Sequence, residues 1–168
     1  DLTSLQESGT LQFEQNPALQ GVELSRLESV DGGLYFDLNG AITTISLPAL
    51  ASTSKGLTFE ELSVLERIDL PQLTAVGGRI WVRANEVLSE VSAPQLRTLS
   101  PSPPSKSDPA LDVRDNPNLQ RVNFAALETI KSSLRIENND LLTVDAEGFP
   151  LLRSIPGAIT VVGGGQEE

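Results

Sequence analysis

The sequence contains no Cys, no His and no Met, and it has a single Trp and a single Tyr among its 168 residues. Without Cys there are no disulfides, no thiolate metal sites and no thiol nucleophiles. Without His the chain lacks the commonest general base and the commonest metal ligand. We therefore predict that it holds no cofactor and no metal, and that carboxylates are its only candidates for catalysis.

Basic residues are also scarce, with 12 Lys and Arg against 23 Asp and Glu, which gives a net charge of −11. Nucleic acid is excluded as a partner because phosphate binding needs a concentration of positive charge. No apolar run approaches the roughly 18 residues that span a bilayer, so direct membrane insertion is not expected. Because the chain does not begin with Met, we expect a processed chain with its signal peptide removed, or a fragment of a longer protein.

Apolar residues recur along the chain at a fixed interval. Rows aligned on their first apolar residue repeat every 23 residues, and one longer interval of 31 contains the Pro- and Ser-rich segment 100–109, a predicted insertion loop. The whole chain, 1–168, is therefore predicted to be a single domain of about six similar turns. The rows begin at Leu11, Leu34, Leu57, Ile80, Leu111 and Leu134.

Spacing within each row predicts the local structure. Apolar residues two apart, such as Leu11 and Phe13 or Val22 and Leu24, indicate the inward face of a short strand. Steps of three with polar residues between them indicate corners. Stacking the turns pairs the strands in parallel. The prediction is a mainly β fold with little helix, a right-handed parallel β-solenoid.

Two columns of residues mark the predicted corners. Gly residues before the strands, among them Gly32 and Gly77, are predicted to adopt left-handed turn conformations, as are the Gly33 and Gly78 that follow them. A column of Asn after the strands is predicted to form a hydrogen-bonded ladder between turns, interrupted where Leu62 replaces Asn. This column consists of Asn16, Asn39, Asn85, Asn116 and Asn139.

Two segments, 27–39 (LESVDGGLYFDLN) and 73–85 (LTAVGGRIWVRAN), resemble the receptor L-domain repeat. The resemblance extends from about Leu2 to Val161 and includes leucine-rich solenoids of fungal cell-wall and bacterial surface proteins. It implies a non-catalytic extracellular or cell-surface module that binds a protein or glycan partner. The chain lacks the disulfides of growth-factor receptor L domains and the N-glycosylation acceptors usual in fungal wall proteins, which favours a bacterial exported protein.

The outward face of the strands is the predicted binding surface. Tyr35 and Trp81 lie in one outward column, two turns apart, and Arg residues gather around Trp81 in an otherwise acidic chain. Binding hot spots use aromatic and Arg residues. The alternative is that these side chains merely cover the sheet. The predicted binding residues are Tyr35, Thr58, Arg79, Trp81, Arg83, Asp112, Arg114 and Arg135.

A structural role is the second function that the sequence leaves open. Leu2 and Leu5 at one end, and Ile159 and Val161 at the other, belong to incomplete rows. Solenoid ends normally need a polar cap, so such coils are expected to stack against another turn. The alternative function is therefore an assembly in which end coils associate head to tail.

An enzyme is the third possibility. Glu14, Asp37 and Glu60 share an outward column, and glycoside hydrolysis needs only two carboxylates, so they are the candidates for a carbohydrate-active enzyme. The competing interpretation is a solvated acidic stripe. The segment 112–118 is oxygen-rich but lacks the Gly and the distal Glu of a calcium loop, so no metal site is predicted there.

Overall fold

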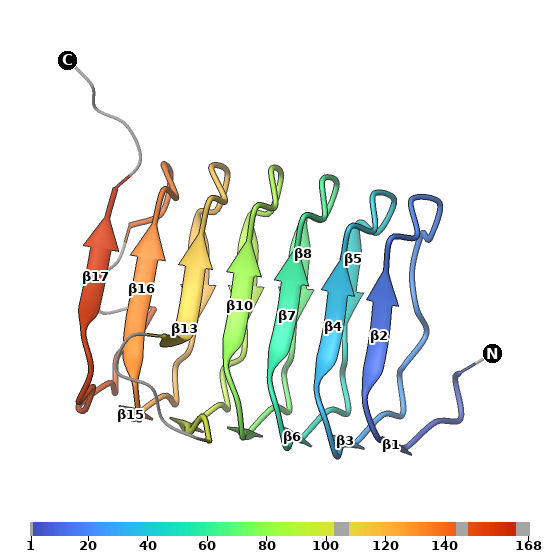
Figure 1. Ribbon diagram of the computed structural model, residues 1–168, viewed down its shortest axis with the longest axis horizontal. Helices are drawn as coiled ribbons and strands as arrows, with labels where there is room; N and C mark the ends of the chain where they lie inside the picture. Colours follow the sequence, from blue (N-terminus) through green and yellow to red (C-terminus); the bar gives the residue numbers. More distant parts are fainter. Residues whose placement is uncertain (1, 103–107, 144–147, 164–168) are drawn as a thin grey trace.

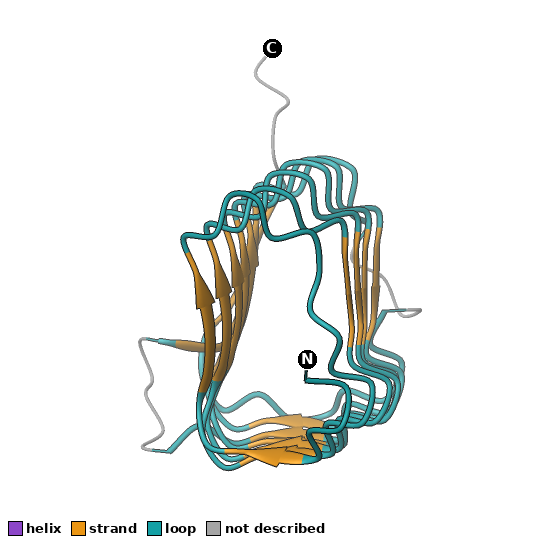
Figure 2. Cartoon of the chain, turned by 90° about the vertical axis from the view of Figure 1, so that its right-hand side faces the viewer, coloured by secondary structure: helices purple, strands orange, loops and turns teal. Residues whose placement is uncertain are grey.

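The chain winds into a prism of three parallel sheets in the computed structural model, which describes residues 2–102, 108–143 and 148–163. The turns stack side by side along the long axis, with β2 and β17 at opposite ends of the seven-stranded sheet (Figure 1). Viewed along this axis, the three sheets lie on three sides of the cross-section and loops close the fourth (Figure 2). The described residues form no helix, and so none that is long and apolar enough to cross a membrane.

Every strand pairs in parallel with its equivalent from the next turn, so each sheet follows chain order. The seven-stranded sheet contains β2 (Leu11–Glu14), β4 (Leu34–Asp37), β7 (Leu57–Glu60), β10 (Ile80–Arg83), β13 (Pro109–Arg114), β16 (Ser133–Glu137) and β17 (Ile159–Val162). The four-stranded sheet contains β5 (Thr44–Ser46), β8 (Arg67–Asp69), β11 (Glu90–Ser92) and β14 (Arg121–Asn123). The six-stranded sheet contains β1 (Glu7–Ser8), β3 (Ser29–Val30), β6 (Ser52–Thr53), β9 (Ala75–Val76), β12 (Thr98–Leu99) and β15 (Thr129–Ile130).

The predicted parallel β-solenoid of about six turns is confirmed. Leu11 pairs with Leu34, Leu34 with Leu57 and Leu57 with Ile80, so the repeat of the sequence is the register of the sheet. The middle turns contribute three short strands each. The strands of the six-stranded sheet were not predicted, because two residues are too few to show an alternating pattern in the sequence. Pro109, assigned to the insertion from its composition, is the first residue of β13, and residues 103–107 of that insertion lie outside the described part of the chain.

The core is aliphatic and is built from alternate residues of each strand. In β4, β7 and β10 the first and third residues are buried and the second and fourth are only partly buried, as expected for strands with one inward face. Phe13, Phe36 and Phe59 stack on one another inside successive turns, with ring centroids 4.9 and 5.9 Å apart. Because each layer is thin, a core side chain packs mainly against its equivalents one turn away.

The predicted left-handed glycines are wrong. The left-handed conformation lies instead just after the strands of the seven-stranded sheet from β2 to β16, where non-Gly residues such as Leu38 (φ 52°) and Ala84 (φ 51°) adopt it. The glycines serve close packing between turns: a Cβ on Gly77 would lie 2.9 Å from the carbonyl carbon of Ser54, and one on Gly78 only 2.7 Å from that of Lys55. Side chains have no room there.

Asn side chains connect successive turns at the corner after the strands. Asn116 donates from Nδ2 to Asn139 Oδ1 (3.1 Å), to Val82 O (3.1 Å) and to Arg114 O (2.9 Å). Its Oδ1 accepts bonds from the backbone and side-chain nitrogens of Asn85, each at 3.1 Å. The ladder stops at Leu62, which has no side-chain amide and is fully buried. The left-handed conformation itself does not require the Asn, because Glu61, which precedes Leu62, adopts it as well.

Candidate functional site

The candidate site lies on the outward surface of the seven-stranded sheet, which we call the strand face. Its middle column follows the register from Tyr35 on β4 to Thr58 on β7, Trp81 on β10, Asp112 on β13 and Arg135 on β16. A flanking column runs two residues further along each strand. That column consists of Glu14, Asp37, Glu60, Arg83, Arg114 and Glu137.

Arginine side chains enclose Trp81. The guanidinium carbon of Arg83 lies 3.8 Å from the centroid of the Trp81 ring, and that of Arg79 lies 5.9 Å away. Arg83 is the last residue of β10 and Arg79 immediately precedes this strand, so the two arginines lie two residues to either side of Trp81 along the chain. A guanidinium at such a distance is attracted by the electron-rich ring face. The predicted association of Trp81 with Arg residues is therefore realised by stacking.

Asp112 is not an exposed contact residue, which corrects the sequence interpretation. Its side chain is fully buried although its strand position points outward. Arg83 donates from Nη2 to Asp112 Oδ2, and Arg114 Nε lies 3.8 Å from Oδ1 of the same carboxylate. Large side chains from the neighbouring strands and from its own strand fold over it. Asp112 therefore fixes the positions of Arg83 and Arg114 and does not itself meet a partner.

Unpartnered polar atoms concentrate in this one cluster. Among the described residues, the side-chain atoms that are buried without a hydrogen-bond partner are Arg79 Nε, Trp81 Nε1, Arg83 Nε, Asp112 Oδ1 and Arg114 Nε. All but one of these are donors. A buried polar group without a partner costs about 1–3 kcal/mol, and natural structures rarely gather several such groups in one place. Arg114 Nε and Asp112 Oδ1 face each other as an ion pair, so the donors that the described residues leave unused are Arg79 Nε, Trp81 Nε1 and Arg83 Nε.

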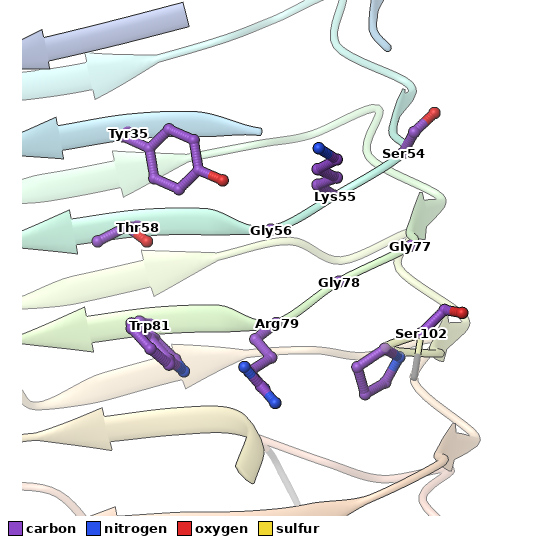
Figure 3. A pocket seen from close by; sticks show the side chains of 11 residues that line it. Tyr35, Ser54, Lys55, Gly56, Thr58, Gly77, Gly78, Arg79, Trp81 and Ser102 are labelled. Carbon is purple, nitrogen blue, oxygen red and sulfur yellow. The ribbon is translucent and has the colours of Figure 1, made fainter. Parts of the chain in front are cut away.

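A hollow of about 250 Å³ opens beside Trp81. Tyr35 and Trp81 line it from strands on either side, and Thr58 lies between them on β7 (Figure 3). Lys55 and Arg79 also line it. We call this hollow the furrow. Its remaining lining residues are Ser54, Gly56, Gly77, Gly78, Pro101 and Ser102.

Sequence reasoning missed Lys55 and the two residues of the insertion that reach the furrow. Lys55 lies just before β7, where a single Lys carries no pattern that distinguishes it from any other loop Lys. Pro101 and Ser102 belong to the predicted insertion, but only the folded chain places them beside the furrow. Their position follows from the stacking of turns and not from any local signal.

The other predicted residues of the strand face lie outside the furrow. Arg135 pairs in register with Asp112, and its Nε lies 3.7 Å from Oε1 of Glu137. The register also aligns Glu14, Asp37 and Glu60 on adjacent strands. A carboxylate-dependent reaction at that column stays a prediction. Within the described part of the chain, no group of three or more acidic residues is arranged to hold a metal ion.

The Receptor L domain family model matches residues 50–154, which is more than half of the chain and includes the furrow-lining strands β7 and β10. The chain belongs to the receptor L domain family. Neither the comparison with curated proteins nor the comparison with solved structures gives a match. Receptor L domains are typically non-catalytic, ligand-binding modules and are usually extracellular.

Proposed function

We propose that this receptor L domain is a recognition module at the cell surface, which binds a protein or glycan partner through the strand face around Trp81. The observation that carries the proposal is the coincidence of three features at one place. The only Trp of the chain, the stacked arginines and the unpartnered buried donors all lie on β10, on β13 or, for Arg79, immediately before β10. Tightly bound partners are typically anchored by Trp and Arg residues in such clusters.

The distribution of charged residues also supports a binding site on the strand face. Lys55, Arg79, Arg83, Arg114 and Arg135 place five cations on this face in a chain of net charge −11, and the three carboxylates of Asp108, Asp112 and Glu137 that pair with four of them leave an excess of positive charge. A local positive area attracts the negative group of a partner. The acidic surface around this area repels the same group, so a negatively charged partner is directed to the strand face. An exported bacterial protein is the setting that we propose, on the basis of the missing Cys and N-glycosylation acceptors.

The test is a binding array of surface proteins and glycans, probed with the wild-type domain and with Trp81→Ala. We expect the partner to bind Trp81→Ala roughly 30-fold more weakly, since an aromatic anchor commonly contributes about 2 kcal/mol. Val64→Ala is the control, because Val64 is an exposed apolar residue in the corner turn between β7 and β8. Partners that bind Trp81→Ala and the wild type equally well would remove the strand face from the proposal.

Self-association through the end coils is a second candidate, and it rests on β17. Ile159, Val161 and Val162 on this strand are 60%, 50% and 51% exposed. Leu11 and Phe13 on β2, at the opposite end, are only partly buried. A parallel pairing of β17 with β2 of a second copy would continue the sheet. Molar mass measured by light scattering should then rise with concentration, and Val161→Lys should abolish the rise; a constant monomer mass would reject this role.

A further inference from the structure

The furrow is formed by a contrast in side-chain size between three neighbouring strands. On β4 and β10 the outward residues are Tyr35 and Trp81, whereas Thr58 on β7 between them is small. Two strand spacings place the walls roughly 10 Å apart. Gly56 precedes β7 and leaves the same strip without a side chain. A volume of about 250 Å³ is at the small end for ligand sites, so the furrow accommodates a single ring or side chain.

The Tyr35 side chain lies flat along its own strand. A Cβ built on Gly33 would lie only 2.6 Å from Cε2 of the Tyr35 ring, so the ring rests directly on the Gly33 backbone. The view in Figure 3 looks onto the face of the Tyr35 ring and onto the edge of Trp81. The Tyr35 ring therefore lies flat on the sheet at the edge of the furrow with one face free, and a sugar ring with C–H groups on one face packs well on such a surface.

Positive charge and unused donors lie at one end of the furrow. Lys55 and Arg79 both line that end. Arg79 Nη2 lies 3.0 Å from Asp108 Oδ2, but Arg79 Nε and Trp81 Nε1 have no partner in the described residues. The Arg79 side chain is 32% exposed, so it has room to turn toward a ligand. Arg and Lys donors bind a carboxylate more strongly than any neutral acceptor.

The strand columns provide acceptors beyond the other end. Asp37 and Glu60 occupy the outward positions two residues after Tyr35 and Thr58, and both are partly exposed. Ionised carboxylates only accept hydrogen bonds. A ligand that extends from the cations toward these residues therefore needs a negative group at one end and hydroxyl donors at the other.

We infer that the furrow binds a carboxylated sugar residue of an acidic glycan, such as a uronic acid or a sialic acid. The inference rests on the proposed function and names the ligand class for the same face. The carboxylate lies between Lys55 and Arg79, the C–H face of the sugar ring packs on Tyr35, and the hydroxyls point toward Asp37 and Glu60. An acidic peptide meets the cations equally well, but its side chain has no hydroxyl donors for Asp37 and Glu60.

The test measures binding of defined sugars by calorimetry and by saturation-transfer NMR. The probes are trigalacturonic acid and sialyllactose, each measured beside its own methyl ester, so each acidic probe has a neutral partner of the same backbone. We expect an acidic probe to bind at least tenfold more tightly than its neutral partner, and this difference should shrink as salt is added. Glutamate-rich peptides are measured in parallel.

Two variants locate the binding. Thr58→Gln should abolish it by filling the furrow without changing charge, and Arg79→Gln should weaken it about tenfold while the weak binding of the neutral probe is unchanged. Arg67→Gln removes one positive charge from β8, on the four-stranded sheet, and should have no effect. Circular dichroism of each variant verifies that it is folded.

Four results overturn the inference. Neutral and acidic probes that bind equally would exclude the carboxylate, and acidic probes that bind Thr58→Gln as they bind the wild type would place the site elsewhere. If only the glutamate-rich peptide binds, the ligand is not a sugar. If no acidic sugar binds, but a partner found in the array binds the wild-type domain and not Trp81→Ala, the inference fails and the proposed function stands.

Discussion

Replacement of Asn116 by Ala tests whether the Asn ladder stabilises the solenoid. Asn116 is fully buried, and its side chain accepts the backbone N–H of Asn85 and donates to Asn139. Truncation leaves the Asn85 N–H buried without an acceptor, at about 1–3 kcal/mol, and removes the bonds of the Asn116 amide, worth about 1 kcal/mol more. We therefore expect a loss of about 3 kcal/mol in the free energy of unfolding.

The matched control is Asn16→Ala at the first corner of the ladder. Asn16 is exposed, and its Nδ2 donates to Glu14 O at 2.8 Å and to Asn39 Oδ1 at 3.2 Å. Water replaces such a donor, so the cost should stay below about 1 kcal/mol. Urea unfolding followed by circular dichroism measures both variants, with the slope of each transition compared to verify that the same unit unfolds. Equal losses at Asn16 and Asn116 would show that burial of the ladder does not determine its contribution.

Two further substitutions test other parts of the structure. Gly78→Ala should destabilise the domain by about 1–3 kcal/mol, because the new Cβ would meet backbone atoms of Lys55 and Gly56. Gly21→Ala is the control and should leave the free energy of unfolding unchanged in the same urea experiment, because no atom lies near the position of its Cβ. Asp112→Asn should cost about 3–5 kcal/mol because it leaves the largely buried Arg83 without its carboxylate. Asp108→Asn, at a more exposed pair, should cost less than about 1 kcal/mol, and similar losses at both positions would show that burial of Asp112 is not decisive.

The repeat made the fold predictable, because the same physical requirement acts in every turn. Leu34, Leu57 and Ile80 occupy one buried column, and the 23-residue interval between them is the register of the sheet. The positions of the left-handed residues were not predictable in this way. Leu38 and Ala84 adopt that conformation without being Gly, and so does Glu61, which precedes Leu62 and not an Asn, so no residue type in the sequence marks these corners.

The candidate site could be predicted only in part. The outward alternation of β10 places Trp81 between Arg79 and Arg83, and that arrangement can be read from the sequence. The burial of Asp112 could not be predicted from the sequence, because it results from Arg side chains on two different strands. The furrow likewise depends on side chains from three turns and on the approach of the insertion, so its outline appears only when the turns are stacked.

The central claim is that a ligand docks on the strand face around Trp81, and fluorescence titration of the wild-type domain tests it most directly. Trp81 is the only Trp in the chain, so its emission reports on this face alone. A ligand that binds here displaces or covers the arginines stacked on the ring, and we predict a saturable change in emission whose midpoint equals the dissociation constant from calorimetry. A ligand that binds by calorimetry but leaves the emission of Trp81 unchanged would contradict the claim.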